Sequence, residues 1–460
     1  MSDAPGTRSR PRERESVSPT MSRDESARRF AVEKDPLGDR VHAWFATAAL
    51  ALQSLTPVTA LVGLIVLAGY AGLRLHATAK CYRTLIAGPL LPILVAILAW
   101  TAMSIIWSPD PEAGLDNLGK YRVGLLVFGL WPVVHHARML ILGLGFGAAV
   151  NAVVQILMIL HVVPDPHFQP VDPSDVMTHT GGLTRHPGMT ALFASMSSVL
   201  LLGLVLQRIA DLRIAIALWF GCIVNVALAG NRTIYLALPV ALAAVVVTNM
   251  WIGGVRRRSI GLAGLCAAVF IVGGVALTPA IDRLQMLYTE LESALTSDEF
   301  SSSGGARFAW WKTSVPIGLE DPLIGHGGGS TRVVFEERMD EIGGRDESTS
   351  ETGATGMIST GDPHSTLLLA WVEQGGIGVG LWCALFATAV FQSLARAVRD
   401  PAWRGLPAAW LILLAYALTN SITMSTFTMS ALAVLVTFTV PISRFDPRRS
   451  SNDSKASLAS

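Results

Sequence analysis

Apolar residues fill long blocks of the chain, and polar residues gather in the gaps between these blocks. A helix needs about 20 predominantly apolar residues to cross the hydrocarbon of a bilayer, and several blocks reach that length. The pattern predicts an all-α integral membrane protein with about 12 transmembrane helices. The predicted spans are 41–56, 58–73, 85–106, 121–135, 138–162, 189–206, 213–230, 233–251, 260–278, 364–391, 404–420 and 424–442.

The composition agrees with a membrane protein. Of the 460 residues, 51% are hydrophobic and 15% are charged, whereas about a quarter of the residues of a soluble protein carry a charge. The four cysteines are Cys81, Cys222, Cys266 and Cys383, and all of them lie outside the longest polar segment. Neither a disulfide framework nor a thiolate metal site is therefore expected.

Lysine and arginine are unevenly shared between the gaps. Short cytoplasmic loops of membrane proteins are enriched in these residues. The basic gaps and both chain termini are therefore predicted to face the cytoplasm, and the acidic gaps to face the opposite side. The basic gaps contain Arg74, Lys80, Arg83, Arg138, Arg208, Arg213, Arg256, Arg257, Arg258, Arg396, Arg399, Arg404, Arg444, Arg448 and Arg449. The acidic gaps contain Asp110, Glu112, Asp116, Asp165, Asp172 and Asp175.

Spans and charges divide the chain into five predicted parts. Residues 1–40 and 443–460 are predicted to be disordered cytoplasmic tails. Helices one to nine occupy 41–278, and helices ten to twelve occupy 364–442. Between them, 279–363 forms a polar extracytoplasmic loop, which is predicted to be catalytic because lipid tolerates irregular charged backbone only outside the hydrocarbon or around a protected cavity. No nucleotide pool exists on that side, which excludes a nucleotide-linked donor at this site.

Three segments of the loop have a predicted structure. Leucines at three- and four-residue spacing predict a helix along the membrane surface. Residues 306–317 predict a second such helix, with Trp310 and Trp311 at interfacial depth. Residues 336–361 are rich in Gly, Ser, Thr and Glu and predict a mobile flap. The spaced leucines are Leu284, Leu287, Leu291 and Leu295.

Three side chains around the loop are candidate catalytic groups. Arg232 lies at an outer turn, at the edge of the hydrocarbon. A charged residue there usually has a functional role, or it is an arginine whose side chain extends to lipid phosphate. Arg307 begins the second short helix and either binds a phosphate through two parallel hydrogen bonds or is a solvated helix end. His364 follows a predicted N-cap and first helical position at Asp362 and Pro363. Its imidazole is suited to proton transfer, or it has only a structural role at the start of the helix.

Further residues are candidates for substrate binding. The turn 325–330 is able to expose successive backbone N–H groups to an anion, although it lacks the GK[ST] ending of a nucleotide-binding loop. Glu373 is a carboxylate within the tenth span that holds a cation or a hydrogen bond across helices. No spacing of Cys, His and carboxylates supports a metal site, so no metal and no cofactor is predicted. The candidate substrate-binding residues are Arg185, His326, Gly325, Gly327, Gly328, Ser330 and Glu373.

The order of these motifs resembles a known family. Residues 321–327, 363–367 and 373–378 resemble the signature of the O-antigen ligase and polymerase superfamily of bacterial membrane glycosyltransferases. The segments around Arg232 and Arg307 resemble the two arginine motifs of that family, in the same order. The resemblance covers roughly Arg185 to Gly380.

The resemblance implies an activity and its partners. Members transfer a glycan from undecaprenyl diphosphate to lipid A–core, to a growing polysaccharide or to a protein, at the outer face of the bacterial inner membrane. Neither a metal nor a nucleotide is known to be needed. Residue by residue, Arg232 and Arg307 would bind the diphosphate, and His364 would deprotonate or position the acceptor hydroxyl. The expected partners are the lipid-linked glycan donor, a glycan or lipid A–core acceptor and membrane lipid, with no nucleic acid.

Three alternatives to an O-antigen ligase stay open at this point. The first is a polysaccharide polymerase of the same superfamily. The second is a transporter or lipid flippase, but such proteins usually place broken, charged helices at mid-membrane, whereas intramembrane charge here is nearly confined to Glu373. The third is a membrane sensor or scaffold that uses the loop as a ligand-binding domain. A glycine-rich loop of about 80 residues without disulfides is poorly suited to fold on its own.

Overall fold

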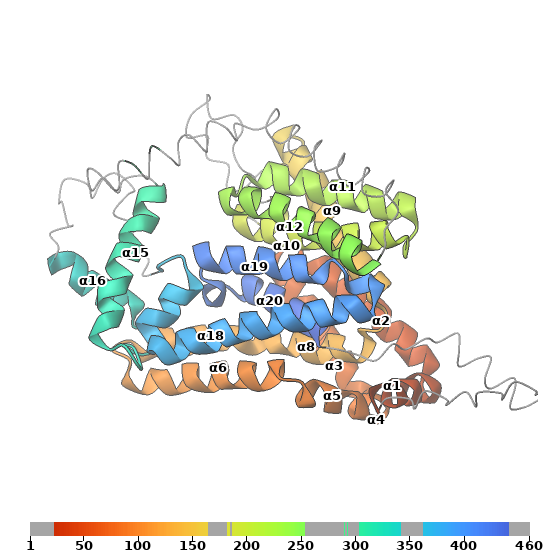
Figure 1. Ribbon diagram of the computed structural model, residues 1–460, viewed down its shortest axis with the longest axis horizontal. Helices are drawn as coiled ribbons and strands as arrows, with labels where there is room; N and C mark the ends of the chain where they lie inside the picture. Colours follow the sequence, from red (N-terminus) through yellow and green to blue (C-terminus); the bar gives the residue numbers. More distant parts are fainter. Residues whose placement is uncertain are drawn as a thin grey trace, which may run out of the picture.

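The computed structural model describes residues 23–163, 182–184, 186–253, 289, 292, 303–341 and 362–440. Every regular element within these residues is a helix, as predicted (Figure 1). The α-helices are α1 (Arg23–Lys34), α2 (Pro36–Gln53), α3 (Pro57–Leu73), α4 (Leu75–Thr78), α5 (Tyr82–Ala87), α6 (Leu90–Ser104), α7 (Pro111–Gly119), α8 (Gly124–Leu130), α9 (Ala137–Ile159), α10 (Pro187–Gln207), α11 (Leu212–Ala229), α12 (Arg232–Gly253), α15 (Ser303–Glu320), α16 (Thr331–Glu341), α18 (Thr366–Arg399), α19 (Leu406–Thr419) and α20 (Thr426–Thr439). The 3₁₀ helices are η1 (Ala79–Cys81), η2 (Ile105–Trp107), η3 (Lys120–Val123), η4 (Trp131–Val133), η5 (Gly182–Thr184), η7 (Pro401–Trp403) and η8 (Ile422–Met424).

The helices are those of a polytopic membrane protein. Within the described residues, seven are long and apolar enough to cross a membrane, or eight if the bent pair Pro57–Leu73 and Leu75–Ala87 forms one span. Large apolar side chains such as Val95, Phe220 and Val247 are exposed on the outer helices, which suits a surface covered by lipid. The predicted span 260–278 lies outside the described residues, so the number of twelve spans stays a prediction.

The predicted span 121–135 is not one continuous helix. It is divided into η3, α8 and η4. Pro132 lacks the N–H group that would continue the helical bonding of α8, which leaves the carbonyl of Phe128 without its helical donor. The hydroxyl of Tyr82 donates to that carbonyl at 2.8 Å. A tyrosine from a neighbouring helix thus replaces the hydrogen bond that the proline removes.

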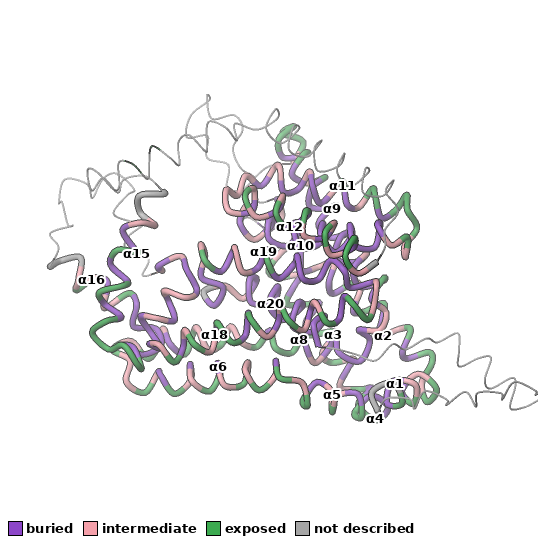
Figure 2. The backbone as a smooth tube through the Cα atoms, viewed as in Figure 1, coloured by how far each residue is buried: buried purple, intermediate pink, exposed green. Residues whose placement is uncertain are grey.

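Helix α10 lies at the centre of the bundle and is almost wholly buried. It packs against α9, α11, α12 and α19. Small residues allow this close approach: a Cβ atom on Gly203 would lie 2.8 Å from the backbone nitrogen of Gly405. Small residues serve this purpose in membranes because lipid gives helices little hydrophobic drive to associate. Figure 2 shows the buried backbone concentrated in these central helices and the exposed backbone along outer helices such as α6.

The N-terminal segment is ordered earlier than the sequence predicted. Residues 23–34 form α1, and α2 begins at Pro36, so the expectation of a disordered tail up to residue 40 is wrong from Arg23 onward. The guanidinium of Arg28 is buried and donates to the carbonyls of Trp131 and Pro132 at 3.1 and 3.3 Å. It also lies 4.8 Å from the ring centroid of Trp131. These contacts tie a polar segment to the bundle.

Helix α18 is broken at Gly375, where φ is 63° and ψ is −163°. In a continuous helix, the N–H groups of residues 376 and 377 would donate to the carbonyls of residues 372 and 373. Instead, the segment 322–327 enters the break and bonds to all four groups. Gly376 N–H donates to the carbonyl of Pro322 at 2.8 Å, Ile377 N–H to Leu323 at 3.3 Å, His326 N–H to Val372 at 2.9 Å and Gly327 N–H to Glu373 at 2.9 Å. Irregular backbone within an apolar region is stable when its N–H and C=O groups are hydrogen-bonded to other parts of the protein, as these groups are.

Two glycines make this junction possible. A Cβ atom on Gly325 would lie 2.6 Å from the backbone nitrogen of Gln374, and one on Gly375 would lie 2.4 Å from the backbone carbon of Leu323. Both residues also have positive φ angles, which side chains rarely tolerate. The motifs at 321–327 and 373–378 are therefore the two halves of one backbone contact, which fixes the loop to α18.

Candidate active site

His364 lies just before α18, at the end of the bundle that also contains α15 and α16 (Figure 1). The predicted N-cap at Asp362 is wrong, because Ser365 caps the helix by accepting a hydrogen bond from the N–H of Leu368. The carboxylate of Asp362 instead accepts the N–H of His364 at 2.9 Å. His364 has a φ of 47°, a left-handed conformation that the surrounding contacts must hold in place. The imidazole is therefore positioned by a turn rather than by the first turn of the helix.

Asp362 and Trp310 bracket the imidazole of His364. Nδ1 of His364 lies 3.5 Å from Oδ2 of Asp362, and the Trp310 ring centroid is 4.4 Å away. Burial lowers the pKa of His364; Asp362 raises this pKa, whereas Arg307 and His186 lower it, and the net shift is downward. The imidazole therefore stays neutral to a lower pH than a free histidine, and a neutral imidazole is a proton acceptor.

Arg307 reaches the same place from the first turns of α15. Its charge acts on both His364 and Tyr416, and Trp310, three residues later on α15, contacts the His364 ring, so the structure brings this predicted arginine within electrostatic range of the predicted histidine. Helix α15 covers the predicted helix 306–317, but it packs against α18. The side chain of Trp310 is buried and that of Trp311 is 37% exposed; their interfacial depth stays a prediction.

Arg232 begins α12 on an adjoining turn. The residue before it, Asn231, and the side chains of His186 and Tyr416 surround Gly188: a Cβ atom on this glycine would lie 3.1 to 3.2 Å from all three. The hydroxyl of Thr233 is hydrogen-bonded to that of Thr419 at 2.8 Å, which fixes the start of α12 to the end of α19. The turn that contains Arg232 is therefore close to His186, which interacts electrostatically with His364, and to Tyr416, which interacts electrostatically with Arg307.

Glu373 forms a second group beside this cluster. Its carboxylate is buried and accepts a hydrogen bond from the hydroxyl of Thr331, on α16, at 2.7 Å. The predicted hydrogen bond across helices is thereby confirmed. The ammonium of Lys120 donates to Oδ1 of Asn117 at 2.6 Å. Burial lowers the pKa of this lysine, while the charges of Asp116, Glu373 and Asp362 raise it. A half-buried cation therefore interacts electrostatically with both Glu373 and the carboxylate beside His364.

The glycine-rich turn does not offer its backbone donors to an anion. The N–H groups of residues 325 to 328 and of Ser330 all donate to backbone carbonyls, and those of Gly329 and Thr331 face the carboxylate of Glu373. The prediction that Gly325, Gly327, Gly328 and Ser330 bind substrate through these groups therefore fails. The donors hold the broken helix and its glutamate instead.

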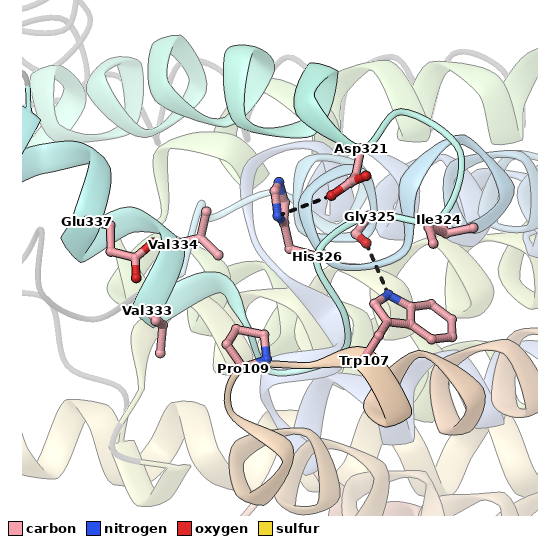
Figure 3. A pocket seen from close by; sticks show the side chains of 9 residues that line it. All are labelled: Trp107, Pro109, Asp321, Ile324, Gly325, His326, Val333, Val334 and Glu337. Carbon is pink, nitrogen blue, oxygen red and sulfur yellow. Dashed lines mark hydrogen bonds and ion pairs between the residues drawn. The ribbon is translucent and has the colours of Figure 1, made fainter.

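His326 belongs to a separate cavity of about 410 Å³ between α16 and the turn after α6 (Figure 3). One ring nitrogen lies 2.9 Å from the carbonyl of Ile317, and the other lies 3.8 Å from a carboxylate oxygen of Asp321. Trp107 closes one side by donating to the carbonyl of Gly325 at 3.1 Å. Acidic groups surround this histidine, so the cavity is poorly suited to a diphosphate. Arg185 and the leucine stripe at 284–295 lie outside the described side chains.

Four polar residues of the site were missed by reasoning from the sequence alone. They are Lys120, His186, Asp362 and Tyr416. Lys120 could have been identified from the sequence, because it is a cation next to an acidic segment, on the side of the membrane where the charge pattern predicts few cations. The sequence predicts Asp362 only as a helix cap, and no motif marks His186. Tyr416 lies in an apolar block, and nothing in the periodicity marks it.

Comparison with known proteins gives one family match. Residues 215–383 of the 460-residue chain match the family model described as O-antigen ligase. The matched stretch lies within the apolar helical bundle that contains the candidate site. The matched stretch contains Arg232, Arg307, His364 and Glu373. No curated protein matches the chain.

Proposed function

We propose that the protein is an O-antigen ligase-type enzyme that transfers a glycan from undecaprenyl diphosphate to an acceptor hydroxyl, such as one on lipid A–core. The observation that carries this proposal is the approach of Arg307 to His364 within the stretch that matches the family. A cation for a leaving diphosphate and a neutral imidazole for an acceptor proton are the two groups that such a transfer needs.

The proposed reaction is a single displacement at the anomeric carbon of the donor glycan. The acceptor oxygen forms the new bond to this carbon while the bond to the diphosphate oxygen breaks. His364 takes the hydroxyl proton, and Asp362 holds its ring through Nδ1. Arg307 and Arg232 bind the leaving diphosphate, and we add Lys120 as a third cation because its charge interacts with the carboxylate of Asp362, beside His364. This set of side chains supports a reaction that does not use a metal.

The charge pattern supports an orientation for this reaction. With the basic gaps in the cytoplasm, both termini face inward, and the site lies at the periplasmic face of a bacterial inner membrane. About twelve spans with the long loop between the ninth and tenth are consistent with this arrangement. A polyprenyl-linked glycan would be available on that side.

Replacement of Arg307 by alanine is expected to reduce transfer by about 10²–10³-fold, the usual cost of losing one preorganised group that stabilises developing charge. Transfer from a synthetic undecaprenyl-diphosphate glycan to lipid A–core is measured with the purified full-length protein in lipid. Lys312→Ala on the same helix is the matched control, since Lys312 is exposed. Normal transfer by the Arg307 variant would contradict the proposal.

The acceptor is tested in the cell. In a deletion strain, loss of polymer from lipid A together with accumulation of lipid-linked chains supports a ligase. Single repeat units on lipid A would indicate a polysaccharide polymerase instead. Unchanged surface glycan would remove the chain from both roles.

The pH dependence of transfer is expected to follow His364. A general base must be neutral, and the lowered pKa of His364 places the acid limb of the profile below the value of an ordinary histidine, about 6.5. Asp362→Asn removes the group that raises this pKa, so the acid limb is expected to move to lower pH still. Transfer rates of both proteins are compared across pH. A shift to higher pH would contradict the assignment of the base.

A further inference from the structure

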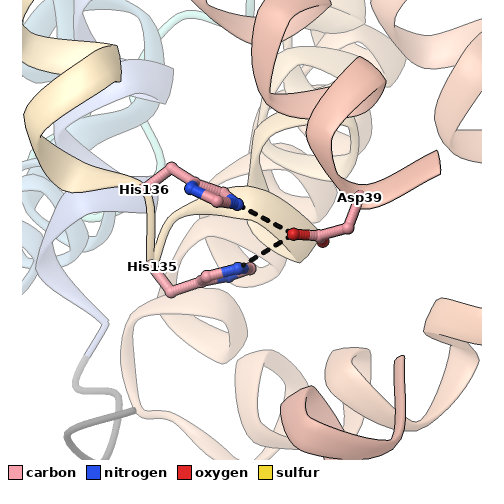
Figure 4. A group of neighbouring side chains, drawn as sticks. All are labelled: Asp39, His135 and His136. Carbon is pink, nitrogen blue, oxygen red and sulfur yellow. Dashed lines mark hydrogen bonds and ion pairs between the residues drawn. The ribbon is translucent and has the colours of Figure 1, made fainter. Parts of the chain in front are cut away.

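Three side chains meet at the end of the bundle opposite the candidate active site (Figure 1, Figure 4). Asp39 lies in the first turn of α2, and His135 and His136 directly precede α9. Nε2 of His135 is 3.3 Å and Nε2 of His136 is 2.8 Å from the same oxygen, Oδ2 of Asp39. One ligand atom from each residue lies within 4.8 Å of the others. Nothing in the proposed transfer uses this cluster.

The packing of α2 against α9 brings these residues together. The two helices run side by side with close contacts at glycines: a Cβ atom on Gly143 would lie 2.6 Å from the carbonyl oxygen of Thr47. A Cβ atom on Gly147 would lie 2.0 Å from the carbonyl oxygen of Ala51. Both pairs have the same sequence separation as Asp39 and His135, which is 96 positions. Asp39 and His135 therefore face each other in the same helix-to-helix register as the two glycine contacts.

The three groups have the chemistry and spacing of a metal site. Imidazole and carboxylate bind Zn²⁺ at about 2.0–2.2 Å, so tetrahedral ligand atoms lie about 3.3 Å apart. Nε2 of His135 already has that separation from Oδ2 of Asp39, at 3.3 Å. Nε2 of His136 lies 2.8 Å from the same oxygen and needs to move away by about half an ångström. The Asp39 and His135 side chains are 5% and 7% exposed, while that of His136 is 28% exposed. The exposed side of His136 gives an entry path and room for a fourth ligand.

The surroundings of the cluster resemble the outer shell of a metal site. Arg74 lies 3.6 Å from the other carboxylate oxygen of Asp39 and donates to Asp35 at 2.9 Å. Such partners orient a ligating carboxylate and leave one oxygen for the ion. Together with the charge of Arg74, the carboxylates of Asp35 and Asp39 leave one net negative charge, which offsets part of the charge of a divalent ion. Without an ion, two imidazoles with ring centroids 4.2 Å apart share a single oxygen.

We propose that Asp39, His135 and His136 bind a divalent transition-metal ion of the Zn²⁺ type, which fastens the start of α2 to the start of α9. The ion is structural and takes no part in glycan transfer. Imidazole with one carboxylate favours Zn²⁺ and its neighbours over Mg²⁺ or Ca²⁺, which prefer oxygen ligands.

The test uses the full-length protein in detergent, purified through a tag without histidines and stripped with EDTA. Co²⁺ is the probe, because its visible absorption bands report nitrogen and oxygen ligands. A single equivalent is expected to bind, Zn²⁺ is expected to displace it, and Zn²⁺ is expected to raise the thermal unfolding temperature. His136→Ala and Asp39→Asn are expected to weaken Co²⁺ binding by more than the roughly 10–100-fold that loss of an outer-shell partner costs.

His76→Ala is the matched control, since this histidine is exposed near the same end of the bundle and should leave Co²⁺ binding unchanged. Absence of a saturable Co²⁺ spectrum in the unaltered protein would overturn the proposal. So would an unchanged spectrum in a folded His136 or Asp39 variant, and either variant alone is decisive if the other does not fold. Glycan transfer by the EDTA-stripped protein should persist, so failure of the metal site does not bear on the proposed transfer.

Discussion

Substitution of His364 by asparagine is expected to reduce glycan transfer by about 10²–10⁴-fold, the usual contribution of a well-placed general base. Asparagine is the informative replacement because it tolerates the left-handed backbone that His364 adopts. The variant should therefore fold and retain the donor, whose diphosphate is held by other residues. Turnover and donor binding are measured separately, and turnover alone is expected to fall.

His161→Asn is the control for this experiment. His161 is exposed and also has a positive φ, 56°, so the same substitution is made in the same backbone conformation at a residue that has no part in the proposed reaction. It should leave turnover unchanged. If His364→Asn turns over at the normal rate, His364 is a structural residue and the base lies elsewhere. If donor binding falls as much as turnover, the imidazole holds the donor rather than the acceptor.

Replacement of Gly375 by alanine is expected to prevent accumulation of folded protein. The backbone at this residue, with φ 63° and ψ −163°, costs about 1–3 kcal/mol for a residue with a side chain. The added Cβ atom would also lie 2.4 Å from the backbone of Leu323. Because backbone rather than a flexible side chain opposes it, the loop segment must leave the break in α18. Four backbone hydrogen bonds in apolar surroundings would then be lost.

Gly380→Ala controls for the effect of a methyl group on the same helix. A Cβ atom there meets no other atom within 4 Å, so this variant should fold normally. Folded yield and the thermal unfolding temperature in detergent distinguish the two variants. Equal stability of Gly375→Ala and Gly380→Ala would show that the loop does not depend on the break. Gly325→Ala should behave like Gly375→Ala, since each glycine faces the backbone of the other's segment.

The membrane-spanning helices were largely predictable because apolar blocks reflect burial in lipid directly. Helices α9, α10, α11 and α12 fall close to the predicted spans at 138–162, 189–206, 213–230 and 233–251. The predicted span 121–135 is helical but divided into η3, α8 and η4, because Pro132 removes a hydrogen bond that hydropathy does not register. The predicted disorder of residues 23–40 is wrong for a related reason, since the partners that bury Arg28 lie about a hundred positions away.

The candidate site was predictable where its residues lie in ordered motifs. Arg307 and His364 were named from the sequence, and the structure brings them together. The prediction that the glycine-rich turn binds an anion is wrong, because the sequence of a glycine-rich turn is the same whether its N–H groups face an anion or a broken helix. Only the partners of these groups distinguish the two cases. Lys120 was missed because it approaches Glu373 from a segment about 250 positions earlier in the chain.

The junction of Gly325 with Gly375 fixes the turn after α15 to α18 through backbone hydrogen bonds, so the two ends of the connection from α16 to Asp362 are held independently of the number of residues between them. Lengthening this connection costs little, because the entropy of closing a loop grows slowly with the number of residues. A small epitope or protease site inserted near residue 350 should therefore leave the contacts of His364 with Asp362 and Trp310 in place. Such an insertion would also report which side of the membrane the loop occupies.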